Sequence, residues 1–304
     1  MFDTVYSIVL MVLLGYGAKM LGIFKESDTP IVNNVILYVC LPCFIAHFVM
    51  NCALDREMFM TPLVAIVVEL ILIFLSLPVC RLMKLSPAKT ISVVMTACFA
   101  NTGFVGYPVI SSFFSDPKAI PTAVIIDQFG MSVLMLCTAP VLMRALHKEG
   151  GGFRPGDLMV FFRRPAIPVF LLCLLLHGLR LPTFLDSTLE TVGKAVVPLS
   201  MLSIGLNLRI DRKLLLEMRP LSVVIIFKFV FSPLLVYAGV RMLGLSQLIG
   251  NVAVLQLGLS SAVIAGIMAS DNGGDKAFAS QSVCVTTLLN VIYIPVCAFL
   301  LGIV

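Results

Sequence analysis

Charged residues are scarce in this sequence. Only 12% of its 304 residues are Asp, Glu, Lys or Arg, 60% are hydrophobic, and the mean hydropathy is +1.07. Average soluble domains carry about 25% charged residues. The composition therefore excludes an ordinary water-soluble protein and indicates an integral membrane protein whose partner is the lipid bilayer. The net charge of +5 is not gathered in a separate basic domain, so no nucleic-acid partner is expected.

The motifs of enzymes and metal sites are also missing. The nine cysteines are odd in number, most lie in apolar segments, and they have no metal-like spacing to the three histidines, so we interpret them as buried small hydrophobes. The sequence has no HExxH helix, no Ser/Lys, Ser/His or paired-Asp arrangement, and no GxxxxGK[ST] phosphate loop. We therefore expect neither an enzyme, nor a metal, nor a cofactor, nor an ATP-driven pump.

Ten apolar segments are long enough to be candidate membrane spans. A helix needs about 20 mostly apolar residues to cross the bilayer core. The ranges are 4–23, 31–51, 61–83, 88–115, 121–145, 165–180, 184–208, 220–243, 247–270 and 277–303. The N-terminus lacks a basic region and a small-residue cleavage site, so we expect the first range to be a retained span and not a signal peptide.

The Lys and Arg residues divide unequally between the two sides of these spans. Fifteen lie in or near the connections on one side, five on the other, and Lys228 lies inside a span. Cytoplasmic loops carry the excess of Lys and Arg. We expect both termini to face outside and the connection 146–164 to be a cytoplasmic linker.

Two halves of the chain resemble each other. A shift of 155 residues places Asn101 on Gln256, Asp116 on Asp271 and Pro140 on Pro295, and a shift of 156 places Pro42 on Pro198. Each half has five spans, an odd number, so the second copy enters the membrane from the opposite face. The sequence predicts an all-α membrane protein with an inverted repeat, 1–145 and 165–304 being the two copies.

The fourth range contains a helix-breaking stretch, ANTGFVGYPV. Asn101 and Thr102 are followed by Gly103, Gly106 and Pro108, and glycine and proline both disfavour helix. We expect the helix to open between Asn101 and Pro108. A broken span is tolerated only inside protein or beside a water-filled cavity, and half-helix N-termini attract anions.

The ninth range carries polar residues at the corresponding depth but no proline: Gln256, Gly258, Ser260, Ser261 and Gly266. Two broken helices that meet at the midplane would form a small anion site. Its expected ligands are the side chains and backbone of Asn101, Thr102, Gly103, Gly106, Gln128, Gln256, Ser260 and Ser261, with Pro108 and Gly258 shaping the breaks. The alternative is a structural role, because small residues also allow membrane helices to pack closely.

Three ionisable residues lie within spans, where charge is costly and often functional. Asp127 lies beside Gln128 in the fifth range. It could bind a coupling proton or Na⁺, or it could form hydrogen bonds to the broken backbone of the fourth range. Glu69 and Lys228 lie at similar depths of the third and eighth ranges, which permits a pair. Such a pair could be a static neutral clamp or a proton-linked switch.

These residues resemble the auxin efflux carrier family, which includes plant PIN carriers and bacterial malate and malonate permeases. The similarity covers the ten spans and is sharpest at ANTGFVGYPV, LPCF in the second span and DQFG in the fifth. It implies a crossover fold like that of bile-acid and Na⁺/H⁺ transporters, with spans 1, 2, 6 and 7 as scaffold and spans 3–5 and 8–10 as the moving domain.

The resemblance further implies elevator-type alternating access and a homodimer. It also implies substrate contacts from Asn101 and Gln128. Glu69 lies in the span where plant members carry a membrane-embedded acid. The short central linker favours a small permease of a bacterial inner membrane over a plant hormone exporter. The expected substrate is a small carboxylate such as malate, malonate, lactate or an auxin-like acid, moved with H⁺ or Na⁺. A passive channel and a transporter-like sensor are the alternatives.

Overall fold

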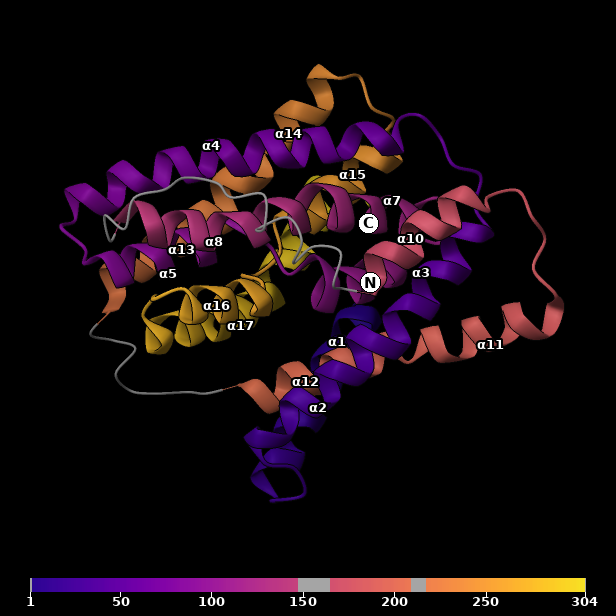
Figure 1. Ribbon diagram of the computed structural model, residues 1–304, viewed down its shortest axis with the longest axis horizontal. Helices are drawn as coiled ribbons and strands as arrows, with labels where there is room; N and C mark the ends of the chain where they lie inside the picture. The colour runs from indigo at the N-terminus through magenta and orange to yellow at the C-terminus, as the bar shows by residue number, and fades with distance from the viewer. Residues whose placement is uncertain (1, 147–164, 209–216, 304) are drawn as a thin grey trace.

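The computed structural model describes residues 2–146, 165–208 and 217–303. Within these ranges every regular element is a helix, and each of the ten expected ranges contains one (Figure 1). All of the linker 146–164 except Leu146 lies outside the described residues.

The helices of the first five ranges are α1 (Phe2–Met20); α2 (Thr29–Val35), η2 (Ile36–Cys40) and α3 (Leu41–Met50); α4 (Thr61–Leu82); α5 (Pro87–Cys98), η4 (Thr102–Gly106) and α6 (Tyr107–Phe113); and α7 (Ala119–Ile125), η5 (Ile126–Met131) and α8 (Ser132–Leu146). Those of the second five are α10 (Ala166–Leu175); α11 (Thr183–Lys194) and α12 (Val196–Asn207); α13 (Met218–Ile226), η7 (Phe227–Phe231) and α14 (Ser232–Met242); α15 (Gln247–Leu257) and α16 (Val263–Asp271); and α17 (Lys276–Leu300). Two short 3₁₀ turns, η1 (Glu26–Asp28) and η3 (Met58–Met60), lie between them.

Six helical runs in the described ranges are long and apolar enough to cross a membrane. The helix α4 has 22 residues, which is about 33 Å at 1.5 Å per residue and matches the hydrocarbon core of about 30 Å. By contrast, α10 has only 10 residues, so the sixth helix ends earlier than the sequence suggests. Large apolar side chains such as Phe74, Leu82 and Phe299 are exposed, as expected for surfaces that face lipid.

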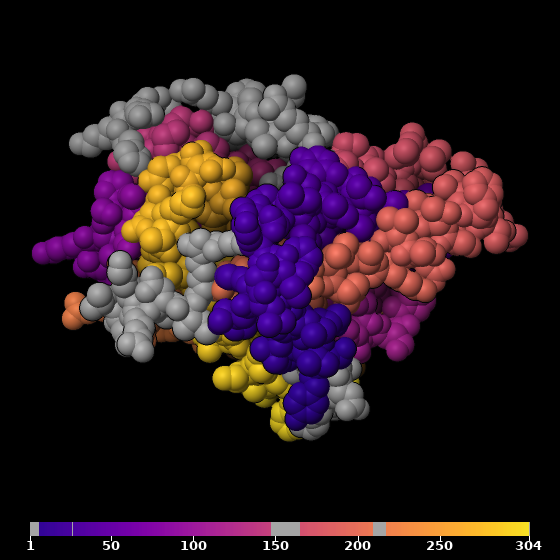
Figure 2. All heavy atoms as spheres, turned by 90° about the horizontal axis from the view of Figure 1, so that it is seen from below, coloured from indigo at the N-terminus to yellow at the C-terminus, as the bar shows by residue number. Residues whose placement is uncertain are grey.

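The helices pack in two sets. One set joins α1 to α12, α3 to α10 and α11, and α2 to α12. The other joins α4 to α5, η5 and α14, and α5 to α13, α16 and α17 (Figure 1). In Figure 2 the indigo N-terminal helices lie between the orange segment of α11 and α12 and the yellow C-terminal helices. The first set contains the helices expected to form the scaffold, and the second contains those expected to move.

Glycine allows the closest contact within the first set. A Cβ on Gly205 of α12 would meet the backbone of α1 at the amide nitrogen of Tyr16, 2.7 Å away, and at the Cα of Gly15, 2.9 Å away. Small residues let membrane helices approach to this distance. Consequently α1 and α12 form a tightly packed pair, of which α12 contributes to the wall of the cavity described below.

The fourth and ninth ranges are both interrupted, and the break in the fourth range lies at a different position from the expected one. In the fourth range α5 ends at Cys98, and the chain is non-helical from Phe99 to Asn101, so the break precedes the predicted stretch from Asn101 to Pro108. The π-helical turn η4 accommodates both glycines, and Pro108 is the second residue of α6, in the first turn, where proline is tolerated. In the ninth range the chain leaves α15 after Leu257 and resumes as α16 at Val263, without a proline.

Candidate functional site

The two interrupted segments cross and pair with each other. Ala100 and Ser261 form an isolated antiparallel bridge. The amide nitrogen of Asn101 donates to the carbonyl oxygen of Ser260 at 2.7 Å, and that of Ala262 donates to the carbonyl oxygen of Phe99 at 2.9 Å. These bonds satisfy backbone groups that no water could reach in the hydrocarbon core. The crossing is therefore stable and leaves the four half-helix ends close together.

Asn101 is the N-cap of the helix that follows the crossing. Its Oδ1 accepts a hydrogen bond from the amide nitrogen of Phe104 at 3.2 Å. Because a backbone N–H can only donate, this bond identifies the capping atom as oxygen and leaves Nδ2 as a free donor. Asn101 is 3% exposed, and its Nδ2 has no hydrogen-bond partner among the described residues.

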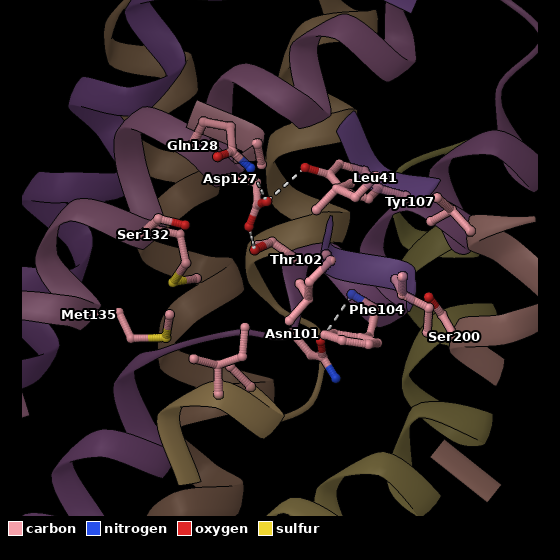
Figure 3. Close-up of a pocket in the computed structure, with 18 of the residues that line it drawn as sticks. Leu41, Asn101, Thr102, Phe104, Tyr107, Asp127, Gln128, Ser132, Met135 and Ser200 are labelled. Carbon is pink, nitrogen blue, oxygen red and sulfur yellow. Dashed lines mark hydrogen bonds between the residues drawn. The ribbon is translucent and has the colours of Figure 1, made fainter. Parts of the chain in front are cut away.

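Asp127 joins η5 to the crossing through side chains (Figure 3). Its Oδ2 accepts from Tyr107 Oη at 2.7 Å and from Gln128 Nε2 at 2.8 Å, and its Oδ1 accepts from Thr102 Oγ1. Three neutral donors on one buried carboxylate fix the position of the first turn after the break. Asp127 thus bonds two side chains of the fourth range, those of Thr102 and Tyr107.

A cavity of about 180 Å³ lies beside this network. Its wall is made by both helix sets. The first set contributes α2, η2, α3 and the starts of α10 and α12, and the second contributes η4, α6, η5, α8 and the start of α16. The polar residues on the wall are Asn34, Tyr38, Asn101, Thr102, Tyr107, Asp127, Gln128, Ser132 and Ser200. None of the described lining residues is Lys, Arg or His.

The cavity also adjoins the N-terminus of α16. Ala262 caps this helix without a side-chain hydrogen bond, and both Ala262 and Ile264 line the wall. The first N–H groups of a helix lack intrahelical acceptors and carry its positive dipole end. Together with Asn101 Nδ2, this helix end makes one part of the cavity suitable for a carboxylate.

The sequence predictions for this site fall into two groups. Asn101, Thr102, Gly103 and Gln128 line the cavity, and Asp127 lies on its wall. The other expected substrate ligands, Gly106, Gln256, Ser260 and Ser261, do not line it.

The second group builds the crossing instead. Gln256 Nε2 donates to the carbonyl oxygens of Thr102 at 3.2 Å and Ala123 at 3.1 Å. Ser261 Oγ donates to the carbonyl oxygen of Thr96 at 2.6 Å. A Cβ on Gly106 would lie 3.2 Å from Gln256, so a small residue is needed where these segments touch.

Gly258 shapes the second break through close packing. It follows the last residue of α15, and a Cβ there would overlap the ring of Tyr293, with Cζ only 2.6 Å away. The tenth helix, α17, thus packs directly onto the second break. This break contains no proline. Asn290, one turn earlier on α17, accepts from the amide nitrogen of Ser260 at 3.0 Å.

Glu69 and Lys228 are both buried, but no ion pair within 4 Å joins them among the described residues. Lys228 Nζ donates to the carbonyl oxygen of Cys98 at 3.0 Å. It therefore caps the C-terminal, negative end of α5. Both carboxyl oxygens of Glu69 lack a hydrogen-bond partner in the part of the chain that is described, and neither residue lines the cavity.

Some site residues were missed by reasoning from the sequence. Tyr107 directly follows the recognised glycine, and its hydroxyl could have been noticed as a donor. Ser132 and Ser200 gave no signal, because isolated serines are common in membrane helices.

A second hollow, of about 500 Å³, lies between α2 and α12 on one side and α16 and α17 on the other. Asn33, Asn207, Asp271 and Lys276 are among its lining residues. It follows the boundary between the same two helix sets as the first cavity. Both hollows would therefore change shape if one set moved against the other.

Comparison with known proteins agrees with a membrane transporter. The family model described as Membrane transport protein matches residues 1–149 and 158–298. The chain is 29% identical over 297 residues to an uncharacterized transporter of Methanothermobacter thermautotrophicus, with 96% of each chain covered. It is 25% identical over 308 residues to an uncharacterized transporter of Methanocaldococcus jannaschii, with 98% of each covered. The uncharacterized transporter YfdV of Escherichia coli K12 is 25% identical over 213 residues, 66% of each chain.

Proposed function

This chain belongs to the auxin efflux carrier family of membrane transport proteins, and from that premise we propose that it is a secondary transporter of a small carboxylate. The observation that carries the proposal is Asn101, a residue of the cavity wall at the crossing whose buried amide donor, Nδ2, has no hydrogen-bond partner among the described residues. An unsatisfied buried donor is costly. A carboxylate oxygen would satisfy it, and the N-terminus of α16 would add a favourable dipole.

The size of the cavity favours a small acid. An engineered apolar cavity of about 150 Å³ holds one benzene molecule, and this one measures about 180 Å³. Acids of three or four carbons suit that volume. Indole-3-acetate has about twice as many heavy atoms as benzene and would require the cavity to widen.

The proposed mechanism is elevator-type alternating access within an inverted five-plus-five repeat. The set containing α4, α5 and α13–α17 would carry the crossing and its substrate past the set containing α1–α3 and α10–α12. The support for this is that the most extensive helix packing lies within each set and that both hollows lie along the boundary between the sets. We further propose a homodimer in a bacterial inner membrane with both termini outside, on the basis of the Lys and Arg distribution.

Symport with H⁺ or Na⁺ is part of the proposal, with Asp127 and Glu69 as the candidate coupling residues. Glu69 is the stronger of the two for a coupling proton, because its buried carboxyl oxygens have no partner in the described chain, whereas Asp127 accepts three hydrogen bonds. A passive channel is less well supported, since it would need a continuous polar lining, whereas polar residues of the described chain line two separate hollows.

Counterflow in proteoliposomes tests the function. Vesicles loaded with unlabelled malate, malonate, lactate or indole-3-acetate are placed in a trace of the same labelled acid, with and without imposed H⁺ or Na⁺ gradients. Saturable uptake of at least one small acid is expected. If well-folded protein exchanges none of them, the proposal is wrong, and uptake that never saturates would favour a channel.

A further inference from the structure

Ser200 on α12 is the second unsatisfied polar group of the cavity. It is fully buried, it lines the cavity, and its Oγ has no hydrogen-bond partner among the described residues. Serines in membrane helices usually bond a carbonyl of their own helix, as Ser111, Ser222 and Ser270 do here. Ser200 Oγ makes no such bond among the described residues, so this hydroxyl is available to bond a ligand.

Ser200 and Asn101 come from different helix sets but face the same space. The helix α12 packs against η4, the turn that Asn101 caps. In Figure 3, Ser200 lies on the opposite side of the view from Ser132 and Met135. A molecule that bonds Asn101 Nδ2 through a carboxylate could therefore present a second polar group to Ser200 Oγ.

The charges around the cavity indicate what that second group can be. No Lys, Arg or His is among the described lining residues, and the carboxylate of Asp127 is already on the wall. The buried cation Lys228 is not available to a second carboxylate, because it donates to the carbonyl oxygen of Cys98 and does not line the cavity. A second negative charge would therefore meet like charge and no cation, at a high cost in a buried site.

We propose that the substrate is a small monocarboxylate with one uncharged polar substituent, a hydroxyl or keto group, and that Ser200 recognises this substituent. This inference rests on the proposed function and specifies its substrate. A serine hydroxyl both donates and accepts, so it serves a hydroxy acid and an oxo acid alike. A monocarboxylate without such a substituent would leave the Ser200 hydroxyl without a hydrogen bond. Sites that bond a polar group of their substrate discriminate strongly, for this reason, against analogues that lack the group.

Competition in the counterflow assay tests the inference with acids of equal carbon number. Unlabelled lactate, pyruvate, propionate and malonate compete with labelled lactate for uptake by wild type, Ser200→Ala and Ser282→Ala. Ser282 is the matched control, because it too is a fully buried serine whose Oγ has no partner in the described chain, but it does not line the cavity.

In wild type, lactate and pyruvate should compete at least about tenfold better than propionate or malonate. Ser200→Ala should reduce lactate to the level of propionate and leave propionate itself unchanged, whereas Ser282→Ala should keep the wild-type order. Malonate or propionate competing as well as lactate in wild type would overturn the inference while leaving a carboxylate transporter intact. An unchanged order in Ser200→Ala would overturn the role of Ser200. Exchange of no acid at all would instead refute the proposed function.

Discussion

Asn101 has two separable roles, and two substitutions distinguish them. Its Oδ1 accepts the capping hydrogen bond from Phe104 at the start of η4, while its Nδ2 has no partner among the described residues and is proposed to bond the substrate. Asn101→Ala removes both groups. Asn101→Ser retains a capping oxygen, since serine and asparagine are comparable N-caps, but its shorter side chain has no second donor.

The magnitudes follow from these bonds. Loss of an N-cap costs about 1 kcal/mol of stability. A hydrogen bond to a charged group is worth about 1.5–3 kcal/mol, which corresponds to about a 10- to 150-fold change in affinity. We expect both variants to lose affinity by that factor, and only Asn101→Ala to lose about 1 kcal/mol of stability.

The assay combines the concentration dependence of counterflow with thermal unfolding of the purified protein in detergent. The reasoning is refuted if Asn101→Ser transports with wild-type affinity, because the amide N–H would then not contact the substrate. Loss of stability in Asn101→Ser equal to that in Asn101→Ala would show that the capping interpretation is wrong.

Three further predictions concern the crossing and the buried charges. Asp127→Asn should abolish or uncouple transport, because an amide cannot accept from all three donors that the carboxylate serves; wild-type accumulation with unchanged dependence on pH and Na⁺ would contradict this. Gly258→Ala should destabilise the protein by about 1–3 kcal/mol through overlap with the tenth helix. Gly17→Ala is the control and should not destabilise it, because a Cβ there would meet nothing within 4 Å. Equal unfolding temperatures of the two variants would count against the packing described. Lys228→Met should cost about 1–3 kcal/mol of stability by leaving a buried carbonyl unsatisfied. A double variant in which Glu69 and Lys228 exchange places should be no more active in counterflow than the single neutral variants of either residue. Higher activity of the double variant would reveal a direct pair.

The broad architecture could be predicted from the sequence, because membrane helices are dictated by length and apolarity. Helices occur at all ten expected ranges, and both interrupted ranges were anticipated. The place of the first break was wrong by several residues. Gly103, Gly106 and Pro108 attract notice as helix breakers, yet the chain opens at Phe99–Asn101 because pairing with the other broken segment satisfies the backbone there. Pairing between residues about 160 apart leaves no local signal.

The site was predictable only in part for a similar reason. Asn101 and Asp127 stand out as polar residues within apolar runs. Gln256, Ser260 and Ser261 stand out equally, but their hydrogen bonds go to the crossing and not to the cavity. Whether a buried polar group serves the fold or a ligand depends on what lies within about 3 Å of it, which the sequence does not specify.

The most direct test of the central claim is a structure of the protein with a bromine-labelled small acid such as 3-bromolactate, located by the anomalous scattering of bromine. The account predicts a single bromine position in the cavity of about 180 Å³, with the carboxylate within hydrogen-bond distance of Asn101 Nδ2 and near the N-terminus of α16. Bromine only in the hollow between α2, α12, α16 and α17, or a carboxylate that makes no contact with Asn101, would contradict it.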